Sequence, residues 1–249
     1  MGNFEESNYE KNLLDRNGVI ELLEKATINK TSLSLARFGH GEVYIAWNTY
    51  PDWILGWKFR EYTGSTGSPK ELQKELQHAL KICDIAGLHV SSSKSEEDRN
   101  CANATRIMLK ELNITPPYVC SAWIAHGLIY NNRFCDWLRQ QKVFLVGRRA
   151  KEAEVVFKKR GHNIVGTLTL EGYDQIQSVC DALCEKKEWN VALISAGIPA
   201  TIITPKLAKA SNRVVIDFGH AMDMAIEGNK FNHDKKLQQF NEQKEKDGK

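Results

Sequence analysis

The sequence contains no run of about 18 apolar residues, so it has no candidate transmembrane helix. Residues 1–12 are polar and acid-rich, without the apolar core of a signal peptide. The 34 basic and 31 acidic side chains nearly balance, and no dense Lys/Arg block occurs. Such a balance does not favour a nucleic-acid partner. We therefore expect a cytoplasmic protein with no nucleic acid as ligand.

Several catalytic fingerprints are also missing. There is no Gly-x-Gly-x-x-Gly and no Gly-x-x-x-x-Gly-Lys-Ser/Thr, which disfavours a dinucleotide oxidoreductase and a P-loop NTPase. The absence of Gly-x-Ser-x-Gly and His-Glu-x-x-His disfavours a serine hydrolase and a zinc protease. The six cysteines include no Cys-x-x-Cys pair, and Cys180 and Cys184 lie one helical turn apart on an apolar stripe. We interpret these two as small buried hydrophobic residues.

What remains is an ordinary globular composition, with 42% apolar and 26% charged residues, in which apolar strands alternate with amphipathic helices. This alternation predicts an α/β fold with a Rossmann-like, mostly parallel sheet and helices on both faces. The expected strands are 32–36, 85–90, 118–120, 142–147, 163–166, 190–195 and 213–217. The expected helices are 19–26, 69–83, 95–112, 122–130, 132–140, 148–161, 172–187 and 201–210. Residues 17–228 form the predicted domain, with a loose arm at 1–16 and a polar, solvated tail at 229–249.

The stretch from Ser32 to Glu42 organises this pattern. An apolar strand ends in Arg37-Phe38-Gly39-His40-Gly41-Glu42, and a segment that can turn helical follows. A strand that meets a glycine-rich corner and then a helix places backbone N–H groups at the mouth of an α/β sheet. His40 and Glu42 at this corner are candidate ligands for a divalent cation.

Three further strand ends carry residues suited to a ligand: Gly147-Arg148, the turn from Gly197 to Thr201, and Asp217-Phe218-Gly219-His220. Together they favour a nucleotide or a sugar phosphate, because parallel sheets bind ligands at the carboxyl ends of their strands. A plain structural role is possible for each. Asp217 can cap the next helix, and His220 can be a packing or surface histidine.

Four segments of the sequence resemble signatures of the GT-D fold glycosyltransferases, a family once known only as a domain of unknown function. Arg37-Phe38-Gly39-His40-Gly41-Glu42 is similar to that family's Arg-Phe-Gly-Asp-Gly-Glu. The segments 143–147 and 196–200 resemble its central strand and its Gly-x-Pro turn. The segment 215–220 is similar to its closing Asp-x-Gly-His/Asn element. The resemblance spans roughly residues 17–228.

The resemblance implies transfer of a sugar from a UDP-sugar donor to a glycan, glycoprotein or glycolipid acceptor, with a cation such as Mn²⁺. The family's Asp-x-Glu metal motif falls on His40 and Glu42, so a histidine stands where an aspartate is expected. Imidazole brings no negative charge and prefers softer metals than Mn²⁺. Three possibilities follow: metal held through His40 and Glu42, transfer without metal, or a non-catalytic nucleotide-sugar binding protein. A phosphosugar enzyme of another α/β family also fits the glycine corners.

Breaking the bond to the diphosphate builds negative charge on the leaving group, and an acceptor hydroxyl needs a general base. The aromatic residues near Trp53 and Tyr62 either stack on a sugar or simply pack a small subdomain. The expected roles are catalytic for Asp217 and His220, metal-binding for His40 and Glu42, and nucleotide-sugar binding for Arg37, Gly39, Gly41, Gly147, Arg148, Gly197 and Thr201.

Overall fold

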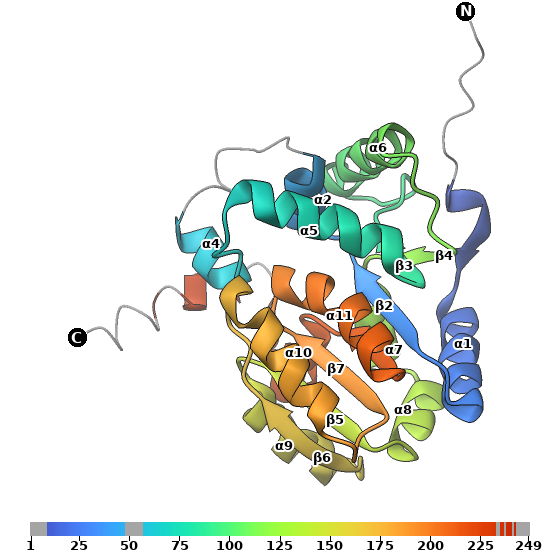
Figure 1. Cartoon of the computed structure of the whole chain (residues 1–249), viewed down its shortest axis with the longest axis vertical. Helices are drawn as coiled ribbons and strands as arrows, with labels where there is room; N and C mark the ends of the chain where they lie inside the picture. Colours follow the sequence, from blue (N-terminus) through green and yellow to red (C-terminus); the bar gives the residue numbers. More distant parts are fainter. Residues whose placement is uncertain (1–8, 48–56, 233–234, 237, 241, 243–249) are drawn as a thin grey trace, which may run out of the picture.

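In a computed structural model of the chain, eight parallel strands form one sheet in the order β1-β4-β3-β2-β8-β7-β5-β6 (Figure 1). The structure describes residues 9–47, 57–232, 235–236, 238–240 and 242. The strands are β1 (Leu13–Leu14), β2 (Leu33–Arg37), β3 (Ile85–Leu88), β4 (Tyr118–Ser121), β5 (Val143–Gly147), β6 (Ile164–Leu168), β7 (Val191–Ser195) and β8 (Val214–Asp217). The prediction of a parallel α/β sheet is confirmed.

Helices cover both faces of the sheet, as expected. Two apolar clusters lie on opposite sides of the strands, and each contains alternate strand residues. In β2, for example, Leu33 and Leu35 belong to one cluster and Ala36 to the other. One face carries α2 (His40–Trp47), α5 (Pro69–Ile82), α6 (Glu96–Glu111), α10 (Ile176–Glu185) and α11 (Ile198–Ser211). The other carries α1 (Arg16–Asn29), α7 (Ile124–Leu128), α8 (Asn132–Arg139), α9 (Ala150–Lys159) and α12 (Ala221–Glu227).

The helix ends follow local chemistry. Ser68 and Glu71 form a capping box, with Pro69 in the first turn, and this starts α5 at the expected residue. The start of α11 differs from the expectation, because the helix begins at Ile198 and includes Pro199 in its first turn. Proline is compatible with a first turn, where its missing N–H has no helical partner. Across the ranges that the structure describes, no helix has the length and apolarity needed to cross a bilayer.

The described part of the N-terminal arm is more ordered than expected. Tyr9–Asn12 form a 3₁₀ helix, η1, and β1 adds to the edge of the sheet by pairing with β4. The Tyr9 hydroxyl donates to the backbone oxygen of His89 at 2.5 Å. The ion pair of Glu10 with Arg106 of α6 adds a second anchor. These partners lie more than 75 residues away in the chain, so local composition gave no sign of them.

The described residues of the C-terminal tail also contact the domain, although we expected this tail to be solvated. Lys236 is buried and forms an ion pair with Glu227 of α12. The Phe240 ring lies 5.5 Å from the Tyr62 ring and 4.4 Å from the guanidinium carbon of Arg148. These aromatic and cation–π contacts supply apolar burial that the polar composition of the tail does not suggest.

The connections that follow the neighbouring strands β2 and β8 leave the sheet toward opposite faces. The helix that follows β2, α2, packs on one face of the sheet, whereas α12, which follows β8, packs on the other. Adjacent parallel strands whose connections leave to opposite faces open a crevice at their carboxyl ends. The two family-like motifs of the sequence, at 37–42 and 217–220, meet where these two strands end.

Candidate functional site

The ends of β2 and β8 are joined by Arg37 and Asp217. The backbone ladder between the strands stops at Leu35 and Ile216. Beyond it, the Arg37 backbone N–H donates to Asp217 Oδ2 at 3.1 Å and Nη2 donates to Oδ1 at 3.1 Å. Arg37 Nε also donates to the Asp217 backbone oxygen at 2.9 Å. The carboxylate therefore extends the strand pairing by two residues, and its charge is compensated by the guanidinium.

Thr201 completes this buried pair from α11. Its hydroxyl lies 2.9 Å from the Arg37 backbone oxygen and 3.1 Å from Asp217 Oδ2. Both Thr201 and Asp217 are almost fully buried. Both oxygens of Asp217 thus accept hydrogen bonds from neighbouring residues. The alternative role of Asp217 as a helix cap is not seen, because α12 begins after His220 and has no side-chain cap.

Gly219 makes room for the Arg37 guanidinium. Its φ of +46° lies in the left-handed region, and a Cβ at this position would stand 1.7 Å from Arg37 Nη2. The close approach of backbone and guanidinium therefore requires glycine. The glycine after β8 is consequently part of the same arrangement as the arginine that ends β2.

Glu42 folds back over the start of α2. A Cβ on Gly39 would lie 3.0 Å from Glu42 Oε2, so the carboxyl group lies against the glycine corner. Burial, together with the negative charge of Asp217, raises the pKa of Glu42 to about 7, although backbone N–H groups and Arg37 favour the ionised form. A Cβ on Gly41, by contrast, would meet the side chains of Phe59 and Ile198. Glu42 therefore changes charge near neutral pH.

His40 lies in a different group from Glu42. Its ring is 4.2 Å from the ring of His89, which directly follows β3, and one ligand atom from each of His40, His89 and Cys101 lies within 4.8 Å of the others. Asp98 Oδ1 lies 3.1 Å from His40 Nε2 and 3.0 Å from His89 Nδ1. This three-residue group could hold a metal ion, and it does not include Glu42.

The charges in this group are strongly affected by burial. His89 is almost fully buried, and its burial, with the nearby His40, lowers its pKa to about 4, so its ring is neutral at neutral pH. Burial acts to raise the pKa of Asp98, but hydrogen bonds from Ser93 and Trp123 and the adjacent histidines bring it below the ordinary value. An ionised carboxylate beside the neutral imidazole of His89 is the result.

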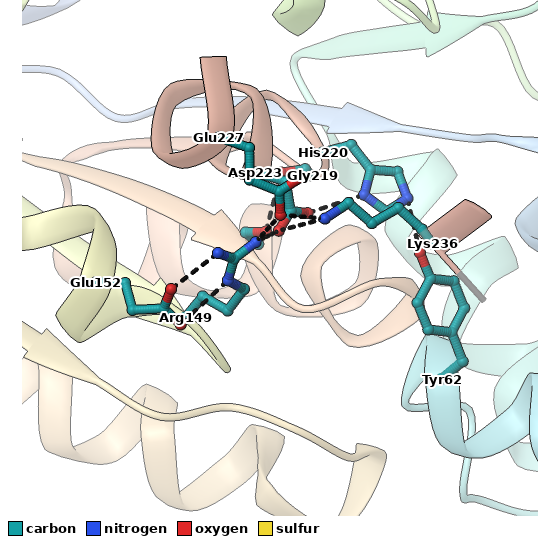
Figure 2. A network of polar contacts seen from close by, with 9 residues as sticks. Tyr62, Arg149, Glu152, Gly219, His220, Asp223, Glu227 and Lys236 are labelled. Atoms are coloured by element: carbon teal, nitrogen blue, oxygen red, sulfur yellow. Dashed lines mark hydrogen bonds and ion pairs between the residues drawn. The ribbon is translucent and has the colours of Figure 1, made fainter. Parts of the chain in front are cut away.

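His220 lies at the end of β8 in a second polar network (Figure 2). Its Nδ1 is 3.0 Å from Asp223 Oδ2, and its Nε2 is 3.3 Å from the Tyr62 hydroxyl of α4 (Trp57–Thr63). Asp223 also accepts from Arg149 Nη1 at 2.7 Å. Although burial acts to raise the pKa of Asp223, the His220, Lys236 and Arg149 contacts lower it. A carboxylate that holds one nitrogen of a histidine orients the ring and selects its tautomer.

The ends of β5 and β7 lie beside the last turn of α4. Arg148 Nη2, just after Gly147, donates to the Glu61 backbone oxygen at 3.3 Å. A Cβ on Gly197 would lie 2.4 Å from the backbone oxygen of Thr63, and its φ is +60°. This glycine is therefore required where the N-terminus of α11 meets α4. Gly147, Arg148 and Gly197 consequently come together at this edge, as the sequence suggested.

Sequence reasoning missed the partners that complete both networks. His89, Asp98 and Cys101 lie 49 to 61 residues beyond His40, and no spacing rule connects them. Asp223 was within reach, because a carboxylate three residues after a histidine lies on the same face of a helix. The Trp53 region lies outside the described residues, whereas Tyr62 contacts His220.

A profile of the GT-D fold-like domain matches residues 14–225. The chain belongs to this family. Two solved structures resemble the GT-D-like chain over 88% of its length. One, described as a conserved domain of unknown function 1792 with a distinct glycosyltransferase fold, is 13% identical, is covered over 83% of its chain and has a TM-score of 0.59. The other, described as a new glycosyltransferase (DUF1792) from Streptococcus sanguinis, is 16% identical, is covered over 86% and has a TM-score of 0.60.

No curated protein matches the sequence. At these identities the solved structures establish the shared glycosyltransferase fold of the GT-D-like chain. The expected family and fold class are therefore confirmed.

Replacing Gly219 by alanine should displace the Arg37 guanidinium. Gly228 is the matched control, because its φ of +55° is also positive but nothing lies within 4 Å of an added Cβ. We expect Gly219→Ala to lower the free energy of unfolding by at least about 2 kcal/mol more than Gly228→Ala, since only the first also breaks a buried ion pair. Urea unfolding of both variants measures this difference. Equal losses would show that the guanidinium moves without cost.

The raised pKa of Glu42 should make the protein less stable as the pH rises. Between its unfolded pKa of 4.5 and its folded pKa of about 7, the native state binds more protons than the unfolded state. Stability therefore falls from pH 5 to pH 8. Glu42→Gln, which imitates the protonated form, should remove about 1–3 kcal/mol of this fall. Urea unfolding at both pH values, with a chelator present, provides the measurement. A variant with the parent's pH dependence contradicts the assignment.

Proposed function

We propose that this GT-D-like protein is a cytoplasmic glycosyltransferase that moves a sugar from a UDP-sugar donor to a glycan, glycoprotein or glycolipid acceptor. The observation that carries the proposal is the meeting of the two family motifs at one edge of the sheet, where Arg37 and Asp217 join β2 to β8. Ligands of open α/β sheets bind at the carboxyl ends of their strands. The family match and the glycosyltransferase fold support sugar transfer as the chemistry.

The donor diphosphate is proposed to bind where β5 and β7 end. The N-terminus of the 14-residue helix α11 has no side-chain cap, so the positive end of its dipole favours an anion. The Arg148 guanidinium, one-third exposed, lies on the neighbouring strand end and adds a positive charge. These groups would stabilise the negative charge that builds on the leaving diphosphate.

His220 is the proposed general base. With its Nδ1 held by Asp223, its Nε2, which faces the Tyr62 hydroxyl at 3.3 Å, is the nitrogen proposed to accept a proton from an acceptor hydroxyl. An imidazole oriented by a carboxylate has a fixed tautomer. In this proposal Asp223 is a positioning residue, identified by the structure rather than by the sequence.

Asp217 has a positioning role in the same proposal. Its two oxygens accept from Arg37 and Thr201, and it is 2% exposed, which keeps it away from an acceptor hydroxyl. Its contacts fix the ends of β2 and β8 and thereby the loops that carry Gly39, Gly41 and His220. The earlier expectation that Asp217 could be the base has no support from this arrangement.

The expected Mn²⁺ ion fits these residues poorly. Mn²⁺ prefers carboxylate, carbonyl and water oxygens, whereas His40 is grouped with an imidazole and a thiol. Glu42, the carboxylate of the family-like motif, lies against the Gly39 corner instead of in that group. We therefore derive no step of the transfer from Mn²⁺.

Substituting His220 tests the proposal directly. We expect His220→Gln to lower UDP release from the productive UDP-sugar by roughly 100-fold or more, because glutamine cannot accept the proton. His78→Gln, at an exposed position on α5, is the control and should keep the parent rate. Both variants should show the parent's thermal unfolding and the same rise in melting temperature with UDP.

The assay uses a panel of UDP-sugars with and without candidate acceptors. Full turnover by His220→Gln would remove the proposed base but leave sugar transfer in place. UDP binding without release from any donor and acceptor would instead identify a non-catalytic nucleotide-sugar binding protein. If UDP and the UDP-sugars fail to bind at all, the proposed function is wrong.

A further inference from the structure

We propose that His40, His89 and Cys101 form a binding site for a zinc-class metal ion. The three side chains come from different parts of the fold: the start of α2, the end of β3 and the second turn of α6. One ligand atom from each lies within 4.8 Å of the other two. Ligands of a tetrahedral Zn²⁺ lie about 3.4–3.6 Å apart, so side-chain movements of about 1 Å would close the site.

His89 provides the independent sign of a missing partner. Its side chain is 1% exposed, and among the described residues neither ring nitrogen has a hydrogen-bond partner apart from the ion-pair contact of Nδ1 with Asp98. A buried ring nitrogen without a partner costs free energy, because water would otherwise hydrogen-bond to it. A metal ion at the cluster would satisfy this nitrogen.

Asp98 supplies the outer support that such a site needs. Its Oδ1 lies 3.0 Å from His89 Nδ1, on the ring nitrogen opposite Nε2. Its Oδ2 accepts from Ser93 Oγ at 2.7 Å and from Trp123 Nε1 at 3.2 Å, so the carboxylate is itself held in place. Metal-binding histidines commonly donate their second nitrogen to a carboxylate in this way. The pattern assigns Nε2 of His89 to the ion.

The donor types decide which metal fits. Two imidazoles and a thiolate suit Zn²⁺ and disfavour Mn²⁺, which prefers oxygen. The Cys101 thiol would lose its proton to solvent as the Zn–S bond forms, and the histidines would bind as neutral rings. The thiolate and the Asp98 carboxylate together offset the 2+ charge. Three protein ligands leave a fourth position for water or another oxygen.

The site accounts for the departure of this chain from the Asp-x-Glu pattern that the family resemblance suggests. The histidine at position 40 is accompanied by a second histidine and a cysteine, which give it imidazole and thiol neighbours. The inference goes beyond the proposed function, because it concerns metal binding and does not require glycosyl transfer.

Cobalt binding tests the site, since Co²⁺ occupies zinc sites and reports a thiolate ligand by a charge-transfer absorption band. We expect the full chain, stripped with a chelator, to show this band with Co²⁺ at one equivalent. Added Zn²⁺ should abolish the band, and a tenfold excess of Mn²⁺ should not. Cys101→Ser should lose the band and bind Zn²⁺ at least tenfold more weakly. Cys120→Ser removes another fully buried thiol and should behave as the parent.

His89→Gln is a second variant that keeps the thiol, and it should weaken Zn²⁺ binding at least tenfold with an altered cobalt spectrum. Circular dichroism confirms that each variant is folded. A parent without the charge-transfer band, or a band that survives in folded Cys101→Ser, overturns the site. Because UDP release is measured separately, zinc binding without sugar transfer would contradict only the proposed function. Sugar transfer in a protein that binds no Zn²⁺ would contradict only this site.

Discussion

The pairing of Arg37 with Asp217 is the interaction on which the rest of the site depends. It lies where the backbone ladder between β2 and β8 ends, and the carboxylate takes over as acceptor for the Arg37 N–H. In this buried position each charge needs the other, because removing one partner leaves an uncompensated charge in a region of low dielectric. The same pair constrains two neighbours. Gly219 must lack a side chain because the Arg37 guanidinium occupies that space, and the Thr201 hydroxyl donates to Asp217.

Two chemically different networks lie on either side of this pair. Toward β3, His89 and Asp98 are buried, His40 is partly exposed, and the two histidines lie close to Cys101. Toward β5, the His220 and Asp223 network is partly exposed and is covered by Tyr62 and by residues of the C-terminal tail (Figure 2). The first offers soft ligands to a cation, and the second offers an oriented imidazole to a proton. Burial and charge, rather than residue type alone, separate these two kinds of chemistry.

The elements of the fold were accessible from local patterns. Apolar runs such as 142–147 and capping residues such as Ser68 predicted strands and helix starts that the structure contains. The glycine-rich corners also fell where the strands end. The contacts that hold the N-terminal arm and the C-terminal tail against the domain could not be predicted from local patterns. Tyr9 and Lys236 are held by His89 and Glu227, and no feature of their own segments indicates those partners.

Residue order alone therefore settled the α/β class, the parallel sheet and the family motifs, because strand and helix periodicity and capping are local properties. It also placed candidate side chains at the carboxyl edge of the sheet. Only the tertiary structure decided which of them meet. It grouped His40 with His89 and Cys101 instead of with Glu42, and it enclosed Asp217 between Arg37 and Thr201. These outcomes depend on strand order and helix packing. Both bring together residues far apart in the chain and determine how exposed to solvent each side chain is.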